Sequence, residues 1–132
     1  MQGITKSSSG DDRRMILLVE DEPVLRDILK EGLVEHGYDV QEASGGHEAI
    51  LRMEEHTRID LLLTDVRMPH MSGPELCKAV KSRHPETPVL FMSGFTDYSV
   101  LLQDVADGSV ALIQKPFTLD MLCAQVDAIL LT

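Results

Sequence analysis

Acidic residues follow two of the apolar runs in this sequence of 132 residues. Glu20 and Asp21 come directly after residues 15–19 (MILLV), and Asp65 comes two residues after the run 59–63 (IDLLL). If both runs are neighbouring strands of one parallel sheet, the three carboxylates converge at the edge where open α/β sheets bind ligands. Carboxylates that close need a compensating cation, and oxygen ligands without His or Cys favour Mg²⁺. A solvated acidic rim is the alternative on spacing alone.

A hydroxyl group and an ammonium group are predicted at the same edge. Ser93 ends the apolar run that begins at residue 89, and Lys115 follows the run 110–113. Taken singly, each is an ordinary surface residue. Together with a magnesium ion, they could stabilise the three oxygens of a phosphoryl group while a carboxylate attacks phosphorus in line. The combination therefore indicates phosphoryl transfer to a carboxylate.

Five short apolar runs alternate with segments of helical period, and they would form the scaffold of this site. Their nearly continuous hydrophobicity is typical of strands that are buried on both faces of a parallel sheet. The runs are residues 15–19, 38–40, 59–63, 89–92 and 110–113. Between them, Pro23, Gly37 and the pair of Ser72 and Glu75 mark helix ends. The segment 96–105 is the weakest helix, because its apolar residues are consecutive. Five strands alternating with five helices predict an α/β fold with a doubly wound sheet.

Composition and charge exclude several classes of protein. The 22 acidic and 12 basic residues give a net charge of −10, which argues against direct binding to nucleic acid or to an anionic membrane. The apolar runs are too short to cross a bilayer, and the N-terminus lacks an apolar signal core. Neither membrane insertion nor export is expected.

The remaining features predict one domain without a structural metal site. Residues 1–14 are polar and Ser-rich, so we interpret them as a tail or linker, and residues 15–131 as a single domain. Cys77 and Cys123 fit neither a disulfide framework nor a zinc spacing, and we expect both to be reduced and buried. The five histidines are scattered singly, which does not predict a metal site.

Four segments resemble the motifs of response-regulator receiver domains, which are the phosphoacceptor modules of two-component phosphorelays. They are LLVEDEP, LLLTDVRMPHMSG, PVLFMSGFTD and ALIQKPF, and the resemblance covers residues 14–131. It implies a flavodoxin-like fold with five parallel strands in the order 2-1-3-4-5. It also implies that the bond between Lys115 and Pro116 is cis, which is a rare state for X-Pro bonds in folded proteins.

The resemblance assigns roles motif by motif. Asp65 would be the phosphoacceptor, with Asp21 and Asp65 as direct Mg²⁺ ligands and Glu20 as a ligand through water. The backbone carbonyl of Arg67 would be a further metal ligand. Ser93 would supply the switch hydroxyl, and Lys115 would contact the phosphoryl group.

One position departs from the family pattern. Receiver domains usually carry Tyr or Phe three residues before the lysine, and this chain has Leu112 there. Phosphoryl acceptance does not need that ring, but the usual movement of the aromatic side chain cannot occur. The hypothesis is that Ser93 moves with its loop, residues 94–97, and with the weakly patterned fourth helix.

By the same resemblance, the chain would take its phosphoryl group from a histidine kinase or a histidine phosphotransfer protein in the cytoplasm. It would not be an enzyme, beyond catalysing its own phosphorylation and dephosphorylation. The wording MSGFTD and IQKPFT is most similar to receivers of hybrid sensor histidine kinases, and a stand-alone response regulator is the alternative. Partners, or a second copy in a homodimer, would dock on the face between the fourth helix and the fifth strand, where Tyr98, Val100 and Leu101 are candidates.

Three other functions fit the same architecture less well. A flavin- or nucleotide-binding protein would need a phosphate cradle after the first strand, whereas residues 20–22 are acidic and would repel a phosphate. A phosphohydrolase with an aspartyl intermediate would usually have a second acid where Arg67 lies. A degenerate receiver that acts only as a docking module would not need the complete set of acidic, hydroxyl and lysine residues.

Overall fold

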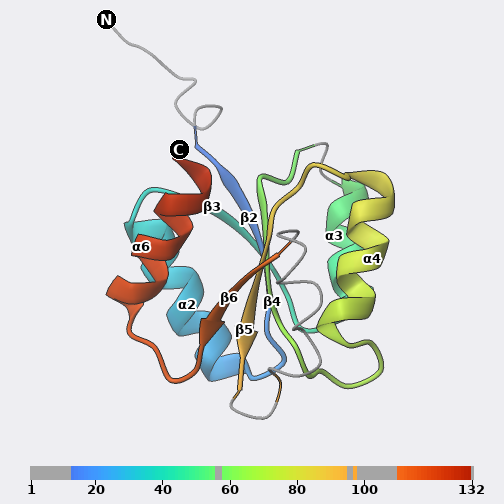
Figure 1. The fold of residues 1–132 in the computed structure, drawn as a ribbon, viewed down its shortest axis with the longest axis horizontal. Helices are drawn as coiled ribbons and strands as arrows, with labels where there is room; N and C mark the ends of the chain where they lie inside the picture. The colour runs from blue at the N-terminus through green and yellow to red at the C-terminus, as the bar shows by residue number, and fades with distance from the viewer. Residues whose placement is uncertain (1–12, 56–57, 95–96, 98–109, 132) are drawn as a thin grey trace, which may run out of the picture.

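One parallel sheet lies at the centre of the computed structural model, which describes residues 13–55, 58–94, 97 and 110–131 (Figure 1). Within these residues the sheet contains five strands: β2 (Met15–Val19), β3 (Asp39–Ala43), β4 (Leu61–Asp65), β5 (Val89–Ser93) and β6 (Ala111–Gln114). Their order across the sheet is β3-β2-β4-β5-β6, and each pair of neighbours is parallel. Counted along the chain, this is the order 2-1-3-4-5, so the predicted fold is confirmed.

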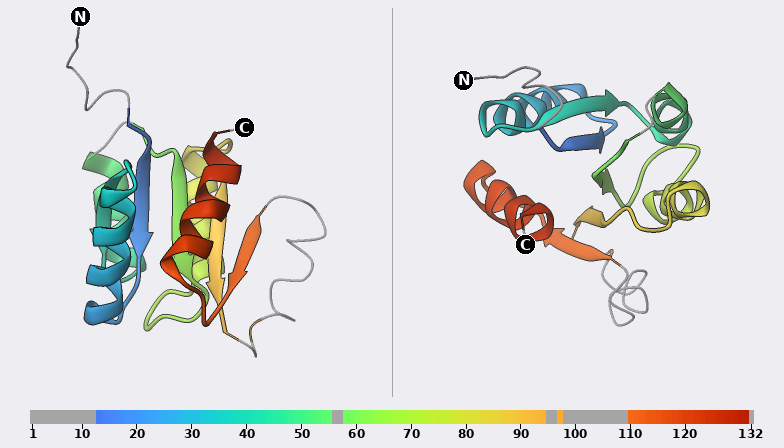
Figure 2. Two further views of the ribbon diagram at one scale, coloured as in Figure 1. Left: turned by 90° about the vertical axis from the view of Figure 1, so that its left-hand side faces the viewer. Right: turned by 90° about the horizontal axis from the view of Figure 1, so that it is seen from above.

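Helices cover both faces of the sheet (Figure 2). On one face lie α2 (Pro23–Glu35) and α6 (Leu119–Leu130), and on the other lie α3 (Gly46–Glu55) and α4 (Gly73–Arg83). The expected weak helix at 96–105 lies outside the described residues apart from Asp97, and so do Tyr98, Val100 and Leu101. Among the described residues, no helix combines the length and the apolar character that crossing a bilayer would require.

The two-sided covering explains why the strands are so apolar. Along β4, Leu61 and Leu63 face the helices α2 and α6, whereas Leu62 faces α3 and α4. All five residues of β4 and of β5 are buried. A strand that is packed on both faces has no solvent-facing side on which polar residues would alternate with apolar ones. The predicted burial of the unpaired cysteines, Cys77 and Cys123, is also confirmed.

Strand ends differ from the predicted ranges in a way that matters for the site. β4 begins at Leu61 and continues to Asp65, which is paired in register with Met92 of β5. The carboxylate therefore belongs to the last strand residue and is not in a loop. β3 continues past Val40 to Ala43, because an edge strand can pair its backbone with β2 while carrying half-buried polar side chains.

The predicted starts of α2 and α4 are confirmed, and both depend on capping residues that are local in sequence. Glu22 caps α2 by accepting the backbone N–H of Leu25 at 2.9 Å, and Pro23 follows it in the first turn. Ser72 and Glu75 form a reciprocal capping box at the start of α4. The cap places α4 directly after the loop that leaves Asp65.

Candidate functional site

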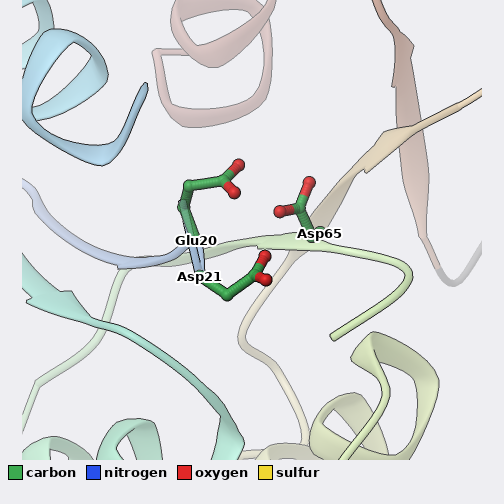
Figure 3. Close-up of side chains that lie close together, drawn as sticks. All are labelled: Glu20, Asp21 and Asp65. Carbon is green, nitrogen blue, oxygen red and sulfur yellow. The ribbon is translucent and has the colours of Figure 1, made fainter. Parts of the chain in front are cut away.

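Three carboxylates meet at the carboxyl end of the sheet, between β2 and β4 (Figure 3). One oxygen from each of Glu20, Asp21 and Asp65 lies within 4.8 Å of the other two. Glu20 and Asp21 directly follow β2, and Asp65 ends the neighbouring strand β4. The convergence that the sequence predicts is therefore present, and the solvated acidic rim is excluded for two of the three, because Glu20 and Asp65 are buried while Asp21 is exposed.

Glu20 has a buried oxygen that lacks a hydrogen-bond partner within the described part of the chain. Its side chain is 2% exposed, and Oε2 accepts the backbone N–H of Glu22 at 3.1 Å. Among the described residues, Oε1 has no hydrogen-bond partner, and Nζ of Lys115 lies 3.6 Å from it. The Arg26 guanidinium donates to the Glu20 carbonyl at 2.8 Å and holds the backbone here. Buried polar atoms normally have a hydrogen-bond partner, so a carboxylate oxygen without one, beside two further acids, fits a site for a cation.

Asp65 is 4% exposed, and Nζ of Lys115 donates a hydrogen bond to its Oδ1 at 2.6 Å. Burial, together with the neighbouring Glu20, raises the pKa of Asp65 well above its ordinary value, although Lys115 opposes that rise. Burial alone would lower the pKa of Lys115, but the hydrogen bond to Asp65 and the charges of both acids outweigh it and raise that pKa. The site thus holds a charged lysine and an excess of negative charge.

The other predicted residues lie at the same edge. Ser93 is 3% exposed at the end of β5, and its carbonyl accepts the backbone N–H of Lys115 at 2.8 Å. The bond between Lys115 and Pro116 is cis, as expected. Leu112 is half-buried and packs against the core on the α3 and α4 side, so an aliphatic side chain occupies the position of the usual aromatic ring.

Arg67 occupies the loop after Asp65. Its side chain is largely exposed and pairs with the buried Asp97 rather than with the carboxylate cluster. The metal-binding role of its backbone carbonyl stays a prediction, as do the roles of Ser93 and Lys115 toward a phosphoryl group.

Two residues near the site had no predicted role. A Cβ on Gly73 would lie 2.1 Å from the backbone oxygen of Asp65 and 3.0 Å from Cε1 of Phe91, so glycine is what lets α4 begin against the end of β4. The other is Asp97, whose carboxylate accepts hydrogen bonds from Arg67, in the loop after β4, and from the backbone N–H of Gly94, directly after β5. The sequence did contain a signal for Gly73. Glycine is a poor helix former, so its place directly after the N-cap Ser72 indicates that a larger side chain would not fit there. Nothing local marks Asp97.

Chemically, the arrangement offers a nucleophilic carboxylate, further acids that can share a cation, and a lysine that can neutralise an anion. The oxygen-only donor set suits a hard divalent ion. An acidic cluster of this kind could hold a metal, and the carboxylate of Asp65 would lie against it.

Comparison with known proteins agrees with this geometry. Residues 16–127 match the family model described as the response regulator receiver domain. Among curated relatives, the sensor kinase CckA of Brucella abortus is 34% identical over 128 residues, which is 96% of this chain and 14% of that protein. The response regulator MprA of Mycobacterium leprae is 34% identical over 115 residues, which is 87% of this chain and 50% of that protein. The chain thus spans at most half the length of these relatives.

Solved structures give the same result. A response regulator receiver domain protein from Clostridium thermocellum superposes with a TM-score of 0.82 at 25% identity, covering 89% of this chain and 94% of that one. The chemotaxis protein CheY4 of Vibrio cholerae superposes with a TM-score of 0.81 at 30% identity, covering 89% of this chain and 99% of that one.

Proposed function

The chain belongs to the response regulator receiver domain family, and we propose that it accepts a phosphoryl group on Asp65 and transmits that state by changing shape. The observation that carries the proposal is the position of Asp65. Its carboxylate is buried at a strand end, 2.6 Å from the Lys115 ammonium and clustered with Glu20 and Asp21. A purely structural carboxylate would not be expected to collect two further acids around it.

In the proposed reaction, an oxygen of Asp65 attacks the phosphorus of a phosphohistidine. The new P–O bond forms as the P–N bond to the donor imidazole breaks, and the imidazole leaves with a proton from the solvent. Lys115, already bonded to Asp65, would neutralise charge on the phosphoryl oxygens, and the Ser93 hydroxyl would contact one of them. Because the pKa of Asp65 is raised, its carboxyl group must lose its proton before it can attack phosphorus, and the Lys115 ammonium favours the deprotonated form.

Glu20, Asp21 and Asp65 are the residues that would hold Mg²⁺, with the Arg67 carbonyl as a further ligand. Bound there, the ion would offset the repulsion among the acids and the charge on the phosphoryl oxygens. The fit rests on the buried Oε1 of Glu20, which has no hydrogen-bond partner among the described residues, and on the oxygen-only donors.

A histidine kinase or histidine phosphotransfer protein is the proposed phosphodonor, in the cytoplasm. The likeness to a sensor kinase over 96% of this chain supports an origin as the receiver module of a hybrid kinase. The equal identity to the response regulator MprA favours the second candidate, a stand-alone regulator. On either proposal the chain is a signalling module, which catalyses only its own phosphorylation and dephosphorylation. A homodimer would use the face between the fourth helix, predicted at residues 96–105, and the fifth strand, β6.

Intact mass after incubation with acetyl phosphate and Mg²⁺ tests the proposal. The wild-type chain should gain one phosphoryl group, whereas Asp65→Asn should gain none. Asp60→Asn is a matched control, because Asp60 binds the backbone N–H of Met15 at 2.7 Å and lies at the opposite end of β4. Equal labelling of Asp65→Asn would refute the assignment. An unlabelled wild-type chain would favour a docking module, and steady release of many phosphates per chain would favour a phosphohydrolase.

A further inference from the structure

A buried carboxylate connects the two loops on either side of the site. Asp97 is 5% exposed and lies four residues after Ser93. Its Oδ1 accepts a hydrogen bond from Nε of Arg67, and its Oδ2 accepts the backbone N–H of Gly94 at 2.7 Å. Because Arg67 lies two residues after Asp65, Asp97 joins the loop that follows the phosphoacceptor to the loop that follows the hydroxyl.

These contacts restrain the backbone around Ser93. The N–H of Asp97 donates to the Gly94 carbonyl at 3.2 Å, so both backbone polar groups of Gly94 are bonded to Asp97. The Ser93 carbonyl is bonded in turn to the N–H of Lys115 at 2.8 Å. Ser93 is therefore held between Lys115 and the turn that Asp97 closes. Movement of the Ser93 backbone toward Asp65 would change the contacts on at least one side.

Arg67 is the partner that can leave this pair. Its side chain is 68% exposed, whereas that of Asp97 is 7% exposed. The guanidinium loses little by moving, because water can solvate it throughout, and the pair borders a cleft of about 390 Å³ that gives it room. A phosphoryl group on Asp65 would carry a charge of about −1.5 to −2 in place of the single negative charge of the carboxylate. It would lie two residues from Arg67, and arginine binds phosphate oxygens with strong paired hydrogen bonds.

We propose that Arg67 and Asp97 form a switchable ion pair that reports the phosphorylation of Asp65, an inference that rests on the proposed function. Without phosphorylation, Arg67 holds Asp97 and, through it, the turn at Gly94. When Asp65 is phosphorylated, the guanidinium transfers to the phosphoryl oxygens. Asp97 then loses its cationic partner, the turn loosens, and Ser93 is free to move. Asp97 acts as a positioning residue for Ser93 and does not contact the reacting atoms.

Two substitutions separate the ion pair from the backbone contact. Asp97→Asn keeps an acceptor oxygen for the Gly94 N–H but removes the charge that attracts Arg67. Arg67→Gln removes the guanidinium at an exposed position and leaves Asp97 its hydrogen bond from the Gly94 N–H. A thermal melt of this variant checks that it is folded under the conditions of the assay. Arg83→Gln is the matched control, since Arg83 is 51% exposed and pairs at 2.9 Å with Glu54, on the helices α4 and α3.

The rate of phosphorylation by acetyl phosphate with Mg²⁺, followed by intact mass, distinguishes these variants. Asp97→Asn should react about fivefold faster than wild type or more, because the competing anion is gone, a ratio at the lower end of typical coupling between sites. Arg67→Gln should react more slowly, and Arg83→Gln at the wild-type rate. In the double variant, Asp97→Asn should have no further effect, because its gain requires Arg67.

A second readout follows the turn itself. The amide resonance of Gly94 should shift when the wild-type chain is held phosphorylated by excess acetyl phosphate, and should shift much less in Arg67→Gln. The switch would be overturned by any of three results. Both single variants could react at the wild-type rate, the double variant could show additive effects, or the Gly94 resonance could stay unshifted on phosphorylation. Failure of the proposed function is a different result, in which the wild-type chain gains no phosphoryl group.

Discussion

Replacing Asp65 with asparagine should stabilise the metal-free protein, although this residue is the proposed nucleophile. Burial and the neighbouring Glu20 raise the pKa of Asp65 from 3.8 to about 8. A carboxyl group whose pKa is higher in the folded state contributes stability that is fully present below the unfolded pKa. That stability is lost as the pH rises through the folded pKa. Asparagine has a similar shape and does not titrate, so the variant avoids this loss.

The size of the effect follows from the pKa shift. Each unit corresponds to about 1.4 kcal/mol, so the loss between the unfolded pKa and pH 7 has an upper limit of about 4 kcal/mol. The free energy of unfolding of Asp65→Asn, minus that of wild type, should therefore rise by up to about 1.4 kcal/mol per pH unit from pH 4 to 8. A net gain on the order of 2 kcal/mol at pH 7 would raise the melting temperature by about 5–10 °C.

Urea denaturation in EDTA, at steps between pH 4 and 8, measures this difference. Asp127→Asn provides a control of opposite sign. Asp127 accepts hydrogen bonds from the Tyr38 hydroxyl and from the His36 ring, and these bonds lower its pKa. Its contribution is present above the unfolded pKa and lost as the pH falls, so Asp127→Asn should be less stable than wild type at pH 7, with the gap closing toward low pH.

Parallel pH curves for wild type and Asp65→Asn, or a variant that is the less stable at pH 7.5 without metal, would refute this reasoning. Mg²⁺ supplies a further check on the same samples. An ion at a hundred times its dissociation constant stabilises the folded state by about 2.7 kcal/mol. Wild type should show this gain, and Asp65→Asn should show less of it, because one of three acidic ligands has lost its charge.

Three further predictions concern residues that hold the site together. Gly73→Ala should lower the free energy of unfolding by about 1–3 kcal/mol, because its Cβ would lie 2.1 Å from the Asp65 carbonyl oxygen, whereas Gly45→Ala, with nothing within 4 Å, should cost less in the same urea titration. Lys115→Ala should melt below wild type in EDTA, since it leaves the buried Asp65 without its cation, and calorimetry should show the gap narrowing as Mg²⁺ is added. Ser72→Ala should cost about 1 kcal/mol through loss of the α4 cap, and a helix-sensitive thermal melt should show no such cost for an exposed serine outside a cap, Ser82→Ala.

Much of this fold was predictable because its signals are local or repeat along the chain. The central strands β4 and β5 are buried on both faces and are therefore largely apolar, so short apolar runs identified them before any contact was known. The edge strand β3 carries polar residues, and its predicted run ended three residues too early. The strands of a parallel sheet end at one edge, which placed Asp65, Ser93 and Lys115 at that edge. The strand order that makes their strands neighbours came from the resemblance to receiver domains. Caps such as Ser72 with Glu75 depend on residues three positions apart, and they too were predictable.

Tertiary structure alone decided the contacts between residues distant in sequence. The extension of β4 to Asp65 depends on pairing with β5, and the demand for glycine at position 73 depends on how closely α4 approaches that strand. The ion pair of Arg67 with Asp97 joins residues thirty positions apart. Periodicity reports which side of an element is buried, but not which side chain meets which across a packed interface. The raised pKa of Asp65 belongs to the same class, because it arises from burial and from neighbours that only the folded chain assembles.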